Sequence, residues 1–361
     1  MNVGILTYPN TNSIGASLQM YALYKILNNM GHSVEVINYN PPNLHNRHRL
    51  PQPTWFQRTK QQMKQVIISC IIPQSQPKFR AFEAQLRKMP SVATSETAVL
   101  QDVAKRYDRI IVGSDQVWNE QITGHDYNFY LEFCDDANKK VSYAASFGND
   151  DVLEEEKEKI AKLLSDFKAI SVREARGQEI VESLIGSRPE LVLDPTLLIS
   201  EVQLREQMIP YRKDKYVLFY TIKPSERLRK IAQAFADRHG YKLVFMNGRV
   251  KDRFAIGRYP VYGVGPREFL GLVDGAEYVF TNSFHGVAIS LAFHKRFYVE
   301  FSSDTNSRLR NVVETFDLSQ CIVNDETADC APVSIDYVSV DRKLAVLRDN
   351  SMLFLRGALK E

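Results

Sequence analysis

The sequence contains few cysteines, only four in 361 residues: Cys70, Cys134, Cys321 and Cys330. They lie far apart, with no C-x-x-C pair and no histidine at metal-ligand spacing, so neither a zinc site nor a disulfide framework is indicated. This pattern fits a reducing compartment. We therefore expect a cytoplasmic protein without a bound metal.

Long apolar runs are missing as well. The longest, VIISCII at residues 66–72, falls far short of the ~20 residues that a membrane-spanning helix needs. The first residues, MNVGILTY, lack a basic segment and a small-residue cleavage motif, so they are typical of a buried strand rather than of a signal peptide. We expect neither a membrane span nor export by a signal peptide.

The fingerprints of nucleotide and nucleic-acid binding are also absent. The polar loop at residues 10–15 opens a predicted helix but has neither the G-x-G-x-x-G nor the Walker pattern. No RNP-like or KH-like motif occurs, and the net charge is only +3. We do not expect nucleic acid as a partner.

Positive charge is nevertheless concentrated in one segment. Residues 45–90 hold nine Lys/Arg and one acidic residue, a net charge of +8, whereas the rest of the chain carries −5. Large apolar residues, including Trp55, Phe56, Phe79 and Phe82, are interleaved with this charge. The mixture predicts either an insertion that covers the domain beneath it, which we favour, or a surface that rests on anionic lipid.

Short apolar strands alternate with amphipathic helices through the whole chain, which is the rhythm of parallel sheets. The predicted strands are 2–8, 33–39, 109–113, 140–146, 169–173, 190–194, 215–221, 241–247, 260–265, 277–282 and 296–301. The predicted helices are 16–31, 95–106, 151–167, 175–185, 225–239, 266–274, 285–294 and 340–358.

A chain of 361 residues is too long for one comfortable core, so we expect two doubly wound α/β domains. The first is placed at 1–195, with the basic insertion near 41–90, and the second at 215–335. Residues 196–214 form the expected linker because they lie between two complete sets of strands. A C-terminal helix within 336–361 could pack back on the first domain.

Polar residues gather where the predicted strands end, and ligands of open α/β sheets bind outside the carboxyl ends of the strands. The groups are Asn10 to Gly15 with Ser13, Gln19, Gly113 to Asp115 with Asn119, Ala145 to Gly148, Arg173 with Glu174, Thr221 with Lys223, Asn247, and Asn282 to His285.

The stretch TNSFHG at residues 281–286 stands between an apolar strand and an apolar helix. Ser283 to Gly286 then form the turn that opens the helix, where free N–H groups and the helix dipole favour an anion. The dipole disfavours the charged form of His285, which leaves an imidazole able to exchange protons. The structural alternative makes Ser283 an N-cap and His285 a satisfied buried histidine.

Arg173 and Asp115 each allow two interpretations. Arg173 can clamp a carboxylate or phosphate with its planar fork, or form an ion pair with Glu174. Asp115 follows a glycine, and it can act in catalysis or close an Asx-type turn.

Together these motifs resemble the polysaccharide pyruvyl transferase family. They are N-S-I-G-A-S-L-Q-M-Y-A-L, Y-D-R-I-I-V-G-S-D-Q-V-W-N, Y-A-A-S-F-G, S-V-R-E, L-D-P-T-L-L and T-N-S-F-H-G, in the expected order over roughly residues 1–300. The resemblance implies two Rossmann-like domains facing a cleft, as in GT-B glycosyltransferases, with the acceptor on the first domain and the donor on the second. It also implies transfer of the pyruvyl group of phosphoenolpyruvate to a sugar of a surface polysaccharide or its lipid-linked precursor, as a ketal, without a cofactor.

The resemblance also implies roles for single residues. The family's V-R-[DE] motif falls on Arg173, which would hold phosphoenolpyruvate, and its S-x-H turn falls on Ser283, Phe284 and His285. Some members have Arg in place of Ser283, so Lys223 or Arg249 would supply that cation. The candidate catalytic residues are His285 and Asp115; the candidate substrate-binding residues are Arg173, Ser283, Phe284, Asn282, Lys223, Asn119, Ser13, Gly15 and Gln19.

Two other classes of function stay open. A nucleotide-sugar-dependent GT-B glycosyltransferase usually carries a ribose-binding carboxylate on the corresponding helix, and here none occurs before Glu300. A carbohydrate-binding protein without activity would not need an Arg and a His at two strand ends. If residues 45–90 rest on lipid, the enzyme acts at the inner face of the cell membrane.

Overall fold

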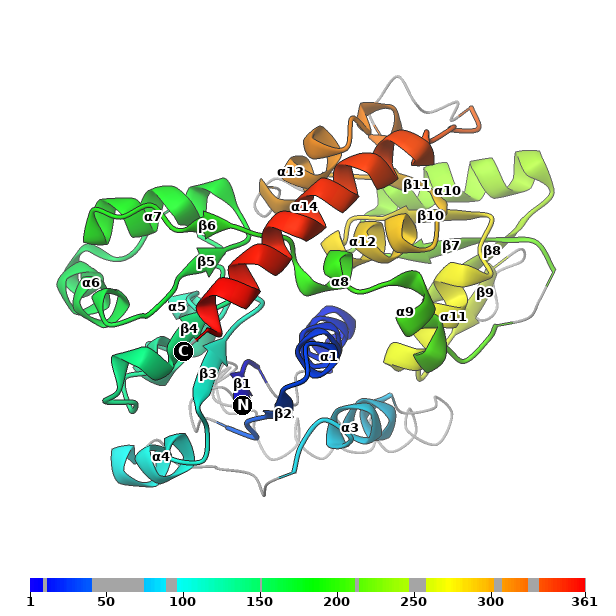
Figure 1. Cartoon of the computed structure of the whole chain (residues 1–361). Helices are drawn as coiled ribbons and strands as arrows, with labels where there is room; N and C mark the ends of the chain where they lie inside the picture. The colour runs from blue at the N-terminus through cyan, green and yellow to red at the C-terminus, as the bar shows by residue number, and fades with distance from the viewer. Residues whose placement is uncertain are drawn as a thin grey trace, which may run out of the picture. The chain divides into compact units, whose positions relative to one another are not determined.

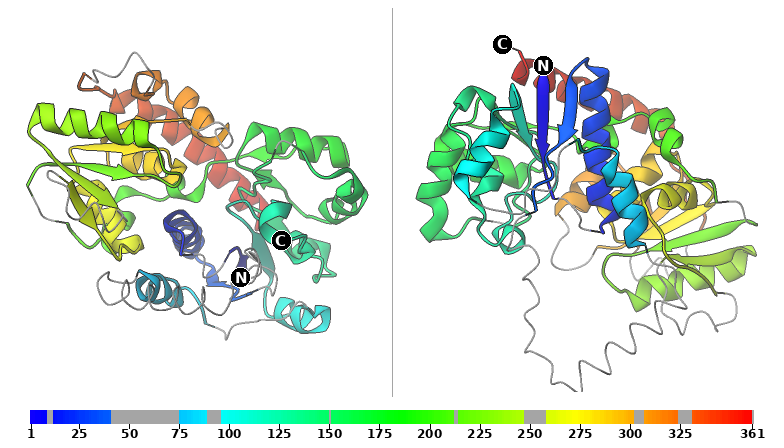
Figure 2. Two further views of the ribbon diagram at one scale, coloured as in Figure 1. Left: turned by 180° about the vertical axis from the view of Figure 1, so that it is seen from behind. Right: turned by 90° about the horizontal axis from the view of Figure 1, so that it is seen from below.

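The computed structural model describes residues 1–8, 12–40, 75–88, 96–149, 151–211, 214–246, 258–301, 307–323 and 331–360 (Figure 1). The chain divides into two compact units. The first comprises Met1–Pro51, Ala81–Ile199 and Ala345–Glu361, and the second comprises Gln52–Arg80 and Ser200–Leu344. Each unit is built on parallel strands, as two further views show (Figure 2).

The first unit has a four-stranded parallel sheet in the order β2-β1-β3-β4. A parallel pair, β5-β6, continues it through isolated bridges of Val141 with Ala169 and of Ala145 with Val172. The strands are β1 (Asn2–Leu6), β2 (Ser33–Val36), β3 (Arg109–Val112), β4 (Lys140–Ser142), β5 (Ser171–Val172) and β6 (Glu190–Leu191). Nearly every residue of β1 to β5 is buried, as expected of parallel strands covered on both faces.

The helices of the first unit connect these strands and enclose an aromatic core. They are α1 (Ile14–Asn29), α4 (Thr97–Ala104), α5 (Glu120–Thr123), η2 (Tyr127–Tyr130), η3 (Ala137–Lys139), η4 (Glu154–Glu156), α6 (Lys157–Ser165), α7 (Ala175–Ile185) and α8 (Pro195–Leu198). Trp118 is buried, stacks on Tyr130 at 5.5 Å between ring centroids, and donates from Nε1 to the Phe129 carbonyl oxygen at 3.1 Å. This satisfied indole fixes the segment that follows β3.

The second unit has a five-stranded parallel sheet in the order β11-β10-β7-β8-β9. Its strands are β7 (Tyr216–Tyr220), β8 (Lys242–Met246), β9 (Arg258–Val261), β10 (Tyr278–Thr281) and β11 (Arg296–Val299). Its helices are α9 (Glu201–Gln207), α10 (Glu226–His239), α11 (Pro266–Asp274), α12 (Phe284–Ala292), α13 (Ser307–Thr315) and η6 (Ser319–Cys321). Right-handed crossovers place α10 and α12 on opposite faces of the sheet (Figure 1).

Each sheet reverses its strand order once. In the first unit the reversal lies between β1 and β3, and in the second it lies between β7 and β10. Ligands of open α/β sheets bind outside the carboxyl ends of the strands at such a reversal. The order of the strands therefore predicts one ligand-binding position in each unit, at its reversal.

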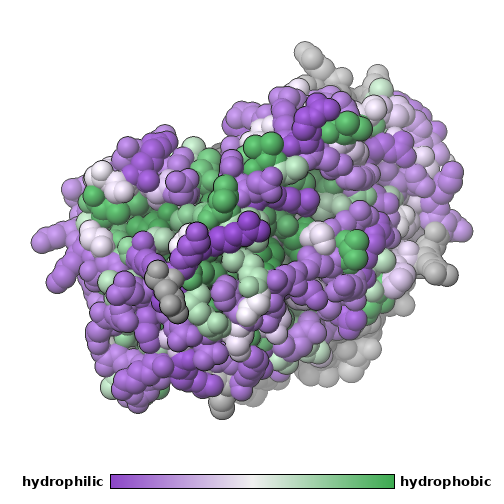
Figure 3. All heavy atoms as spheres, viewed as in Figure 1, coloured by the Kyte–Doolittle hydropathy of each residue, from purple (hydrophilic) through white to green (hydrophobic). Residues whose placement is uncertain are grey.

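The last helix, α14 (Tyr337–Ala358), contributes to both units. In the second unit His294 Nε2 lies 3.0 Å from Asp341 Oδ1. In the first unit Arg348 donates from Nε to the Leu197 carbonyl oxygen at 2.7 Å, and Ser351 Oγ accepts from the Leu193 N–H at 3.0 Å. On the face shown in Figure 3, hydrophobic side chains lie among hydrophilic ones, and Leu353 of this helix is 62% exposed.

α3 (Gln76–Ala84) belongs to the insertion that was predicted from charge. Its two phenylalanines, Phe79 and Phe82, are buried, and the ring of Phe82 lies 5.6 Å from that of Tyr21. For these two residues the covering interpretation is correct, because buried rings cannot rest on lipid. Residues 41–74 and 89–90 of the insertion lie outside the described residues.

Several strands are shorter than the sequence pattern predicted, and backbone conformation gives the reason. The strand expected at 140–146 ends at Ser142 because Ala144 adopts a left-handed φ of 52°, after which Ala145 forms only isolated bridges, with Asp115 and Val172. The strand expected at 260–265 lies at Arg258–Val261, since Gly263 has a φ of 65°. The expected linker at 196–214 includes the helix α9, which begins with a capping box on Ser200.

Two further properties of the described residues are relevant to handling the protein. No helix among them combines the length and apolar character that a membrane span needs. Cys134 in the first unit and Cys321 in the second are buried free thiols. Burial raises the pKa of both thiols, that of Cys321 to about 12.

A pair of helical glycines tests how tightly α12 is packed on its sheet. An added Cβ at Gly286 would collide with Thr281 Oγ1, whereas one at Gly357 in α14 would meet nothing within 4 Å. We expect Gly286→Ala to lower the free energy of unfolding by about 1–3 kcal/mol through overpacking. Gly357→Ala should raise it by up to about 1 kcal/mol through helix propensity. Urea denaturation measures both, and equal effects would contradict the packing argument.

Candidate active site

The turn after β3 carries the first group of polar residues. An added Cβ at Gly113, whose φ is +121°, would collide with the Tyr143 carbonyl oxygen, so this position requires glycine. Ser114 is held on both sides, since its Oγ donates to Gln19 Oε1 at 2.8 Å and its carbonyl oxygen accepts from Thr7 Oγ1 at 3.1 Å. Asp115 follows with a φ of 87°, an uncommon conformation for a residue with a side chain. The turn is thus rigidly placed beside the reversal between β1 and β3.

The three candidate residues of α1 have structural contacts in this unit. Gln19 is buried and bonds to Ser114, as described above. Ser13 caps α1 by accepting from the Ala16 N–H at 3.4 Å, and Gly15 is buried in the first turn. These contacts fix the beginning of α1 against the turn after β3.

Arg173, directly after β5, lies among three carboxylates. Its guanidinium contacts Asp194 Oδ2 at 2.9 Å, Asp115 Oδ1 at 3.2 Å and Glu174 Oε2 at 3.5 Å. Burial would lower the pKa of Arg173, but the three carboxylates outweigh it and raise the pKa above its usual value. The Arg173 side chain is 2% exposed, and of its partners only Asp115, at 20%, has substantial exposure. We call these four residues the first-unit cluster.

The first-unit cluster is supported by a further ring of hydrogen bonds. Asp194 caps α8, and its Oδ1 accepts from the N–H and Oγ1 of Thr196 at 3.0 and 2.7 Å. Ser146 Oγ donates to Glu174. Asn119 is buried at the start of α5 and donates from Nδ2 to Gln116 Oε1 at 3.2 Å.

In the second unit, Asn282 connects the ends of β10 and β7 across the reversal. Its Oδ1 accepts from the Ile222 N–H at 2.9 Å and its Nδ2 donates to the Lys223 carbonyl oxygen at 2.8 Å. Asn282 is buried and Lys223 is exposed. The amide therefore fixes the backbone that carries the Lys223 side chain.

The beginning of α12 is built by Ser283 and Thr281. Ser283 Oγ accepts from the Gly286 N–H at 3.3 Å, and the Ser283 N–H donates to Thr281 Oγ1 at 3.0 Å. Ser283 is thus an N-cap, as the structural alternative stated, and it stands where the helix dipole is positive.

Phe284 and His285 follow in the first turn of α12 and are both buried, each 8% exposed. Their rings meet edge to face at 5.1 Å. The guanidinium of Arg308, from α13, lies 6.0 Å from the Phe284 ring centroid. We call Asn282, Ser283, Phe284, His285, Lys223 and Arg308 the second-unit cluster.

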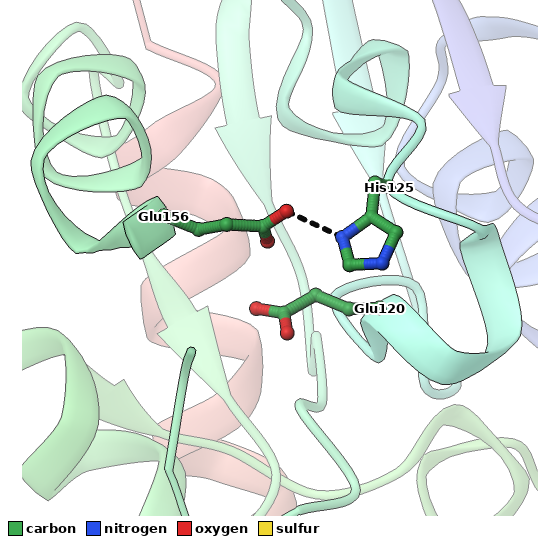
Figure 4. A group of neighbouring side chains, drawn as sticks. All are labelled: Glu120, His125 and Glu156. Atoms are coloured by element: carbon green, nitrogen blue, oxygen red, sulfur yellow. Dashed lines mark hydrogen bonds and ion pairs between the residues drawn. The ribbon is translucent and has the colours of Figure 1, made fainter. Parts of the chain in front are cut away.

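Another group of titratable side chains lies in the first unit, at α5 and η4. Glu120, His125 and Glu156 present ligand atoms within 4.8 Å of one another (Figure 4). His125 Nδ1 bonds to Glu156 Oε1. Burial, followed by the nearby Glu156 carboxylate, raises the pKa of Glu120 to about 7. Among the described residues, this is the group with the composition and spacing to hold a metal ion.

Sequence reasoning missed several of these residues. Asp194 was noticed only as part of L-D-P-T-L-L, and its separation of 21 residues from Arg173 gave no sign of their contact. Arg308 was not considered because it lies on the helix after β11, away from any predicted strand end. Arg249 and Asn247, which were considered, lie outside the described residues.

Comparison with solved structures shows the fold. The chain is similar to UDP-GlcNAc 2-epimerase from Neisseria meningitidis bound to UDP-GlcNAc, at 11% identity and a TM-score of 0.50 over 100% of this chain and 95% of that chain. The UDP-N-acetylglucosamine 2-epimerase from Rickettsia bellii is 9% identical, with a TM-score of 0.50 over 99% of this chain and 95% of that chain. An alpha-glucosyltransferase in complex with UDP-glucose and DNA containing an abasic site is 9% identical, with a TM-score of 0.50 over 98% of this chain and 95% of that chain. The fold is accordingly of the GT-B type that glycosyltransferases and such epimerases share.

Comparison of the sequence alone is more specific. A search among curated proteins gives no match. The family model of polysaccharide pyruvyl transferase matches residues 14–299, a span that contains the first-unit cluster and every candidate residue named from the sequence except Ser13, while Arg308 of the second-unit cluster lies beyond it. Because this match covers most of the chain, the protein belongs to the polysaccharide pyruvyl transferase family and is a transferase.

Proposed function

We propose that the enzyme transfers the pyruvyl group from phosphoenolpyruvate to a sugar of a surface polysaccharide or of its lipid-linked precursor, forming a ketal and releasing phosphate. Membership of the family supports pyruvyl transfer to a polysaccharide. The choice of phosphoenolpyruvate as donor rests on the beginning of α12. There the N-cap Ser283 and the buried His285 lie at the reversal between β7 and β10.

The donor carries a phosphate and a carboxylate, and the second-unit cluster offers what such a dianionic molecule needs. A helix N-terminus presents N–H groups and a positive partial charge to anions. Two full positive charges are added by Lys223, whose carbonyl oxygen bonds to Asn282, and by Arg308, whose guanidinium lies 6.0 Å from the Phe284 ring. Some family members carry an Arg at the position of Ser283. In this chain we assign the role of that cation to Arg308.

The reaction begins with protonation of donor carbon C3, which leaves positive charge on C2. A sugar hydroxyl attacks C2 and loses its proton, and the C2–O bond to phosphate then breaks with its electron pair on the phosphate. A second hydroxyl attacks C2, loses its proton and closes the ketal. His285 is assigned the proton transfer to C3, or acceptance of a hydroxyl proton, since imidazole exchanges protons near neutral pH.

The first-unit cluster suits a neutral acceptor better than it suits the donor. With three ionised carboxylates around one guanidinium, its net charge is about −2, which would repel phosphoenolpyruvate. Arg173 is also almost completely buried, so its fork is not presented to a ligand. We therefore assign Arg173 as a positioning residue for Asp115, the partly exposed carboxylate, which accepts hydrogen bonds from the acceptor hydroxyls together with Asn119.

Contact with the membrane through residues 45–90 stays part of the proposal for the acceptor. A lipid-linked sugar would be presented at an anionic surface, which attracts basic side chains by about 1 kcal/mol each within a Debye length of about 8 Å. Of these residues, 45–74 and 89–90 lie outside the described part of the chain. The buried Phe79 and Phe82 are not available for such a contact.

Thermal shift with separate ligands tests the donor. Phosphoenolpyruvate at a hundredfold excess over its Kd should stabilise the chain by about 2.7 kcal/mol, whereas UDP-GlcNAc and inorganic phosphate should not. Arg308→Gln should reduce the shift strongly, and Arg310→Gln, which changes the next arginine on α13, where the guanidinium lies 5.0 Å from the Phe301 ring, should leave it unchanged. Stabilisation by the nucleotide sugar alone would instead favour a glycosyltransferase.

His285→Ala should retain the fold but lower turnover at least 100-fold, because general acid–base catalysis is typically worth 10²–10⁴. The measurement is phosphate release from phosphoenolpyruvate in the presence of an acceptor extract from a strain that lacks the gene. His294→Ala is the matched control, since His294 is an exposed histidine paired with Asp341, and it should keep full activity. More than a tenth of the wild-type rate in His285→Ala would exclude proton transfer by His285.

Asp115→Asn and Arg173→Lys separate acceptor positioning from donor binding. In Asp115→Asn, Arg173 keeps Asp194 and Glu174, so the chain should fold, and kcat should fall about 100-fold with an unchanged KM for phosphoenolpyruvate. Arg173→Lys loses the planar fork and should change kcat in the same direction. A tenfold rise in that KM for Arg173→Lys, with kcat preserved, would show that Arg173 binds the donor.

A further inference from the structure

The group formed by Glu120, His125 and Glu156 takes no part in the proposed reaction, yet it combines three features that are unusual together. Both glutamates are buried, with 7% and 8% of their surface exposed. They face each other, and the imidazole of His125 points at the same spot from the loop after α5 (Figure 4). The three side chains come from two chain segments, 120–125 and 156, that are about 30 residues apart.

Each carboxylate has some partners but leaves one oxygen without a hydrogen bond: Glu156 contacts His125 and the Tyr127 hydroxyl, and Glu120 contacts the Leu153 backbone and Glu156. Glu120 Oε1 and Glu156 Oε2 are buried and accept no hydrogen bond within the described part of the chain. No described Lys or Arg forms an ion pair with either residue; the neighbouring Lys157 pairs with Asp151 and Glu154, and Lys159 with Glu132. Two facing carboxylates in a poorly solvated place repel each other unless a proton or a positive charge lies between them.

We propose that Glu120, His125 and Glu156 bind a divalent transition-metal ion of the Zn²⁺ class, through one oxygen of each carboxylate and Nδ1 of His125. Two ligands of one such ion, each bound at 2.0–2.2 Å, lie about 3–4.5 Å apart. The ligand atoms here are within 4.8 Å of one another before any adjustment. The ion takes the place of the hydrogen bond between His125 Nδ1 and Glu156 Oε1.

The ligand set also selects the class of ion. A nitrogen ligand with two carboxylates suits borderline ions such as Zn²⁺ and Co²⁺, whereas Mg²⁺ prefers six oxygen ligands. The His125 side chain is 48% exposed, so solvent reaches the group from that side and water can complete the coordination. The ion is independent of the cysteines, whose spacing predicted no metal, and the positions 120, 125 and 156 form no recognised motif.

Such an ion joins the start of α5 to the start of α6. Asn119, which we assigned to the acceptor, is the residue directly before Glu120 and begins α5. The site therefore has a structural role, to hold the segment that carries Asn119, and it requires no metal in the transfer reaction itself. Its test is a measurement of binding and stability rather than of activity.

The experiment uses the full chain, without a histidine tag, stripped with a chelator and then incubated with Zn²⁺. After desalting, elemental mass spectrometry should find about one Zn²⁺ per wild-type chain. At a hundredfold excess over Kd, Zn²⁺ should raise Tm by about 5–10 °C. Glu120→Gln and His125→Ala should each lower the affinity at least about 100-fold, since even loss of an outer-shell partner costs 10–100-fold.

The controls separate this site from adventitious binding and from misfolding. His294→Ala removes a similarly exposed histidine that faces a single carboxylate, and it should bind Zn²⁺ like the wild type. In chelator, Glu120→Gln should be at least as stable as the wild type, because an amide relieves the repulsion between two carboxylates. A wild-type chain that retains no Zn²⁺, or variants at Glu120 and His125 that retain as much as the wild type, would overturn the proposal.

Discussion

A buried guanidinium needs carboxylates around it, and Arg173 has three, contributed by Asp115, Glu174 and Asp194. These residues follow β3, β5 and β6, so one ionic group ties together the ends of three strands and the cap of α8. Removing the guanidinium would leave its carboxylates without compensation, which is strongly destabilising, whereas loss of one carboxylate leaves Arg173 paired with the other two. The geometry of Asp115, and with it the acceptor half of the proposed chemistry, depends on this group.

The two clusters differ in electrostatic character in a way that matches the two substrates. The first-unit cluster has an excess of carboxylate, which can accept hydrogen bonds from neutral hydroxyl groups. The second-unit cluster combines a helix N-terminus with Lys223 and Arg308, which suits an anion. In the proposed function, specificity for a sugar acceptor and an anionic donor thus begins with the sign of the local charge.

The sequence predicted the features that depend on neighbouring residues. β10 and α12 lie where the apolar runs around TNSFHG placed them, and Ser283 is the N-cap, because strand burial and capping are local properties. The carboxylates around Arg173 could not be found in this way, since Asp115 and Asp194 lie 58 and 21 residues away from it. Glu120, His125 and Glu156 were missed for the same reason. Of the two interpretations of the basic insertion, only the one in which its apolar residues cover the domain beneath agrees with the burial of Phe79 and Phe82.

The buried thiols of Cys134 and Cys321 offer a way to follow each unit separately. Only a thiolate reacts rapidly with alkylating reagents, and burial disfavours the thiolate at both positions. Since Cys134 lies in the first unit and Cys321 in the second, the rate of alkylation at each of these two positions reports the opening of its own unit. Peptide mapping of the labelled chain would therefore show whether the units unfold in one cooperative step or one after the other.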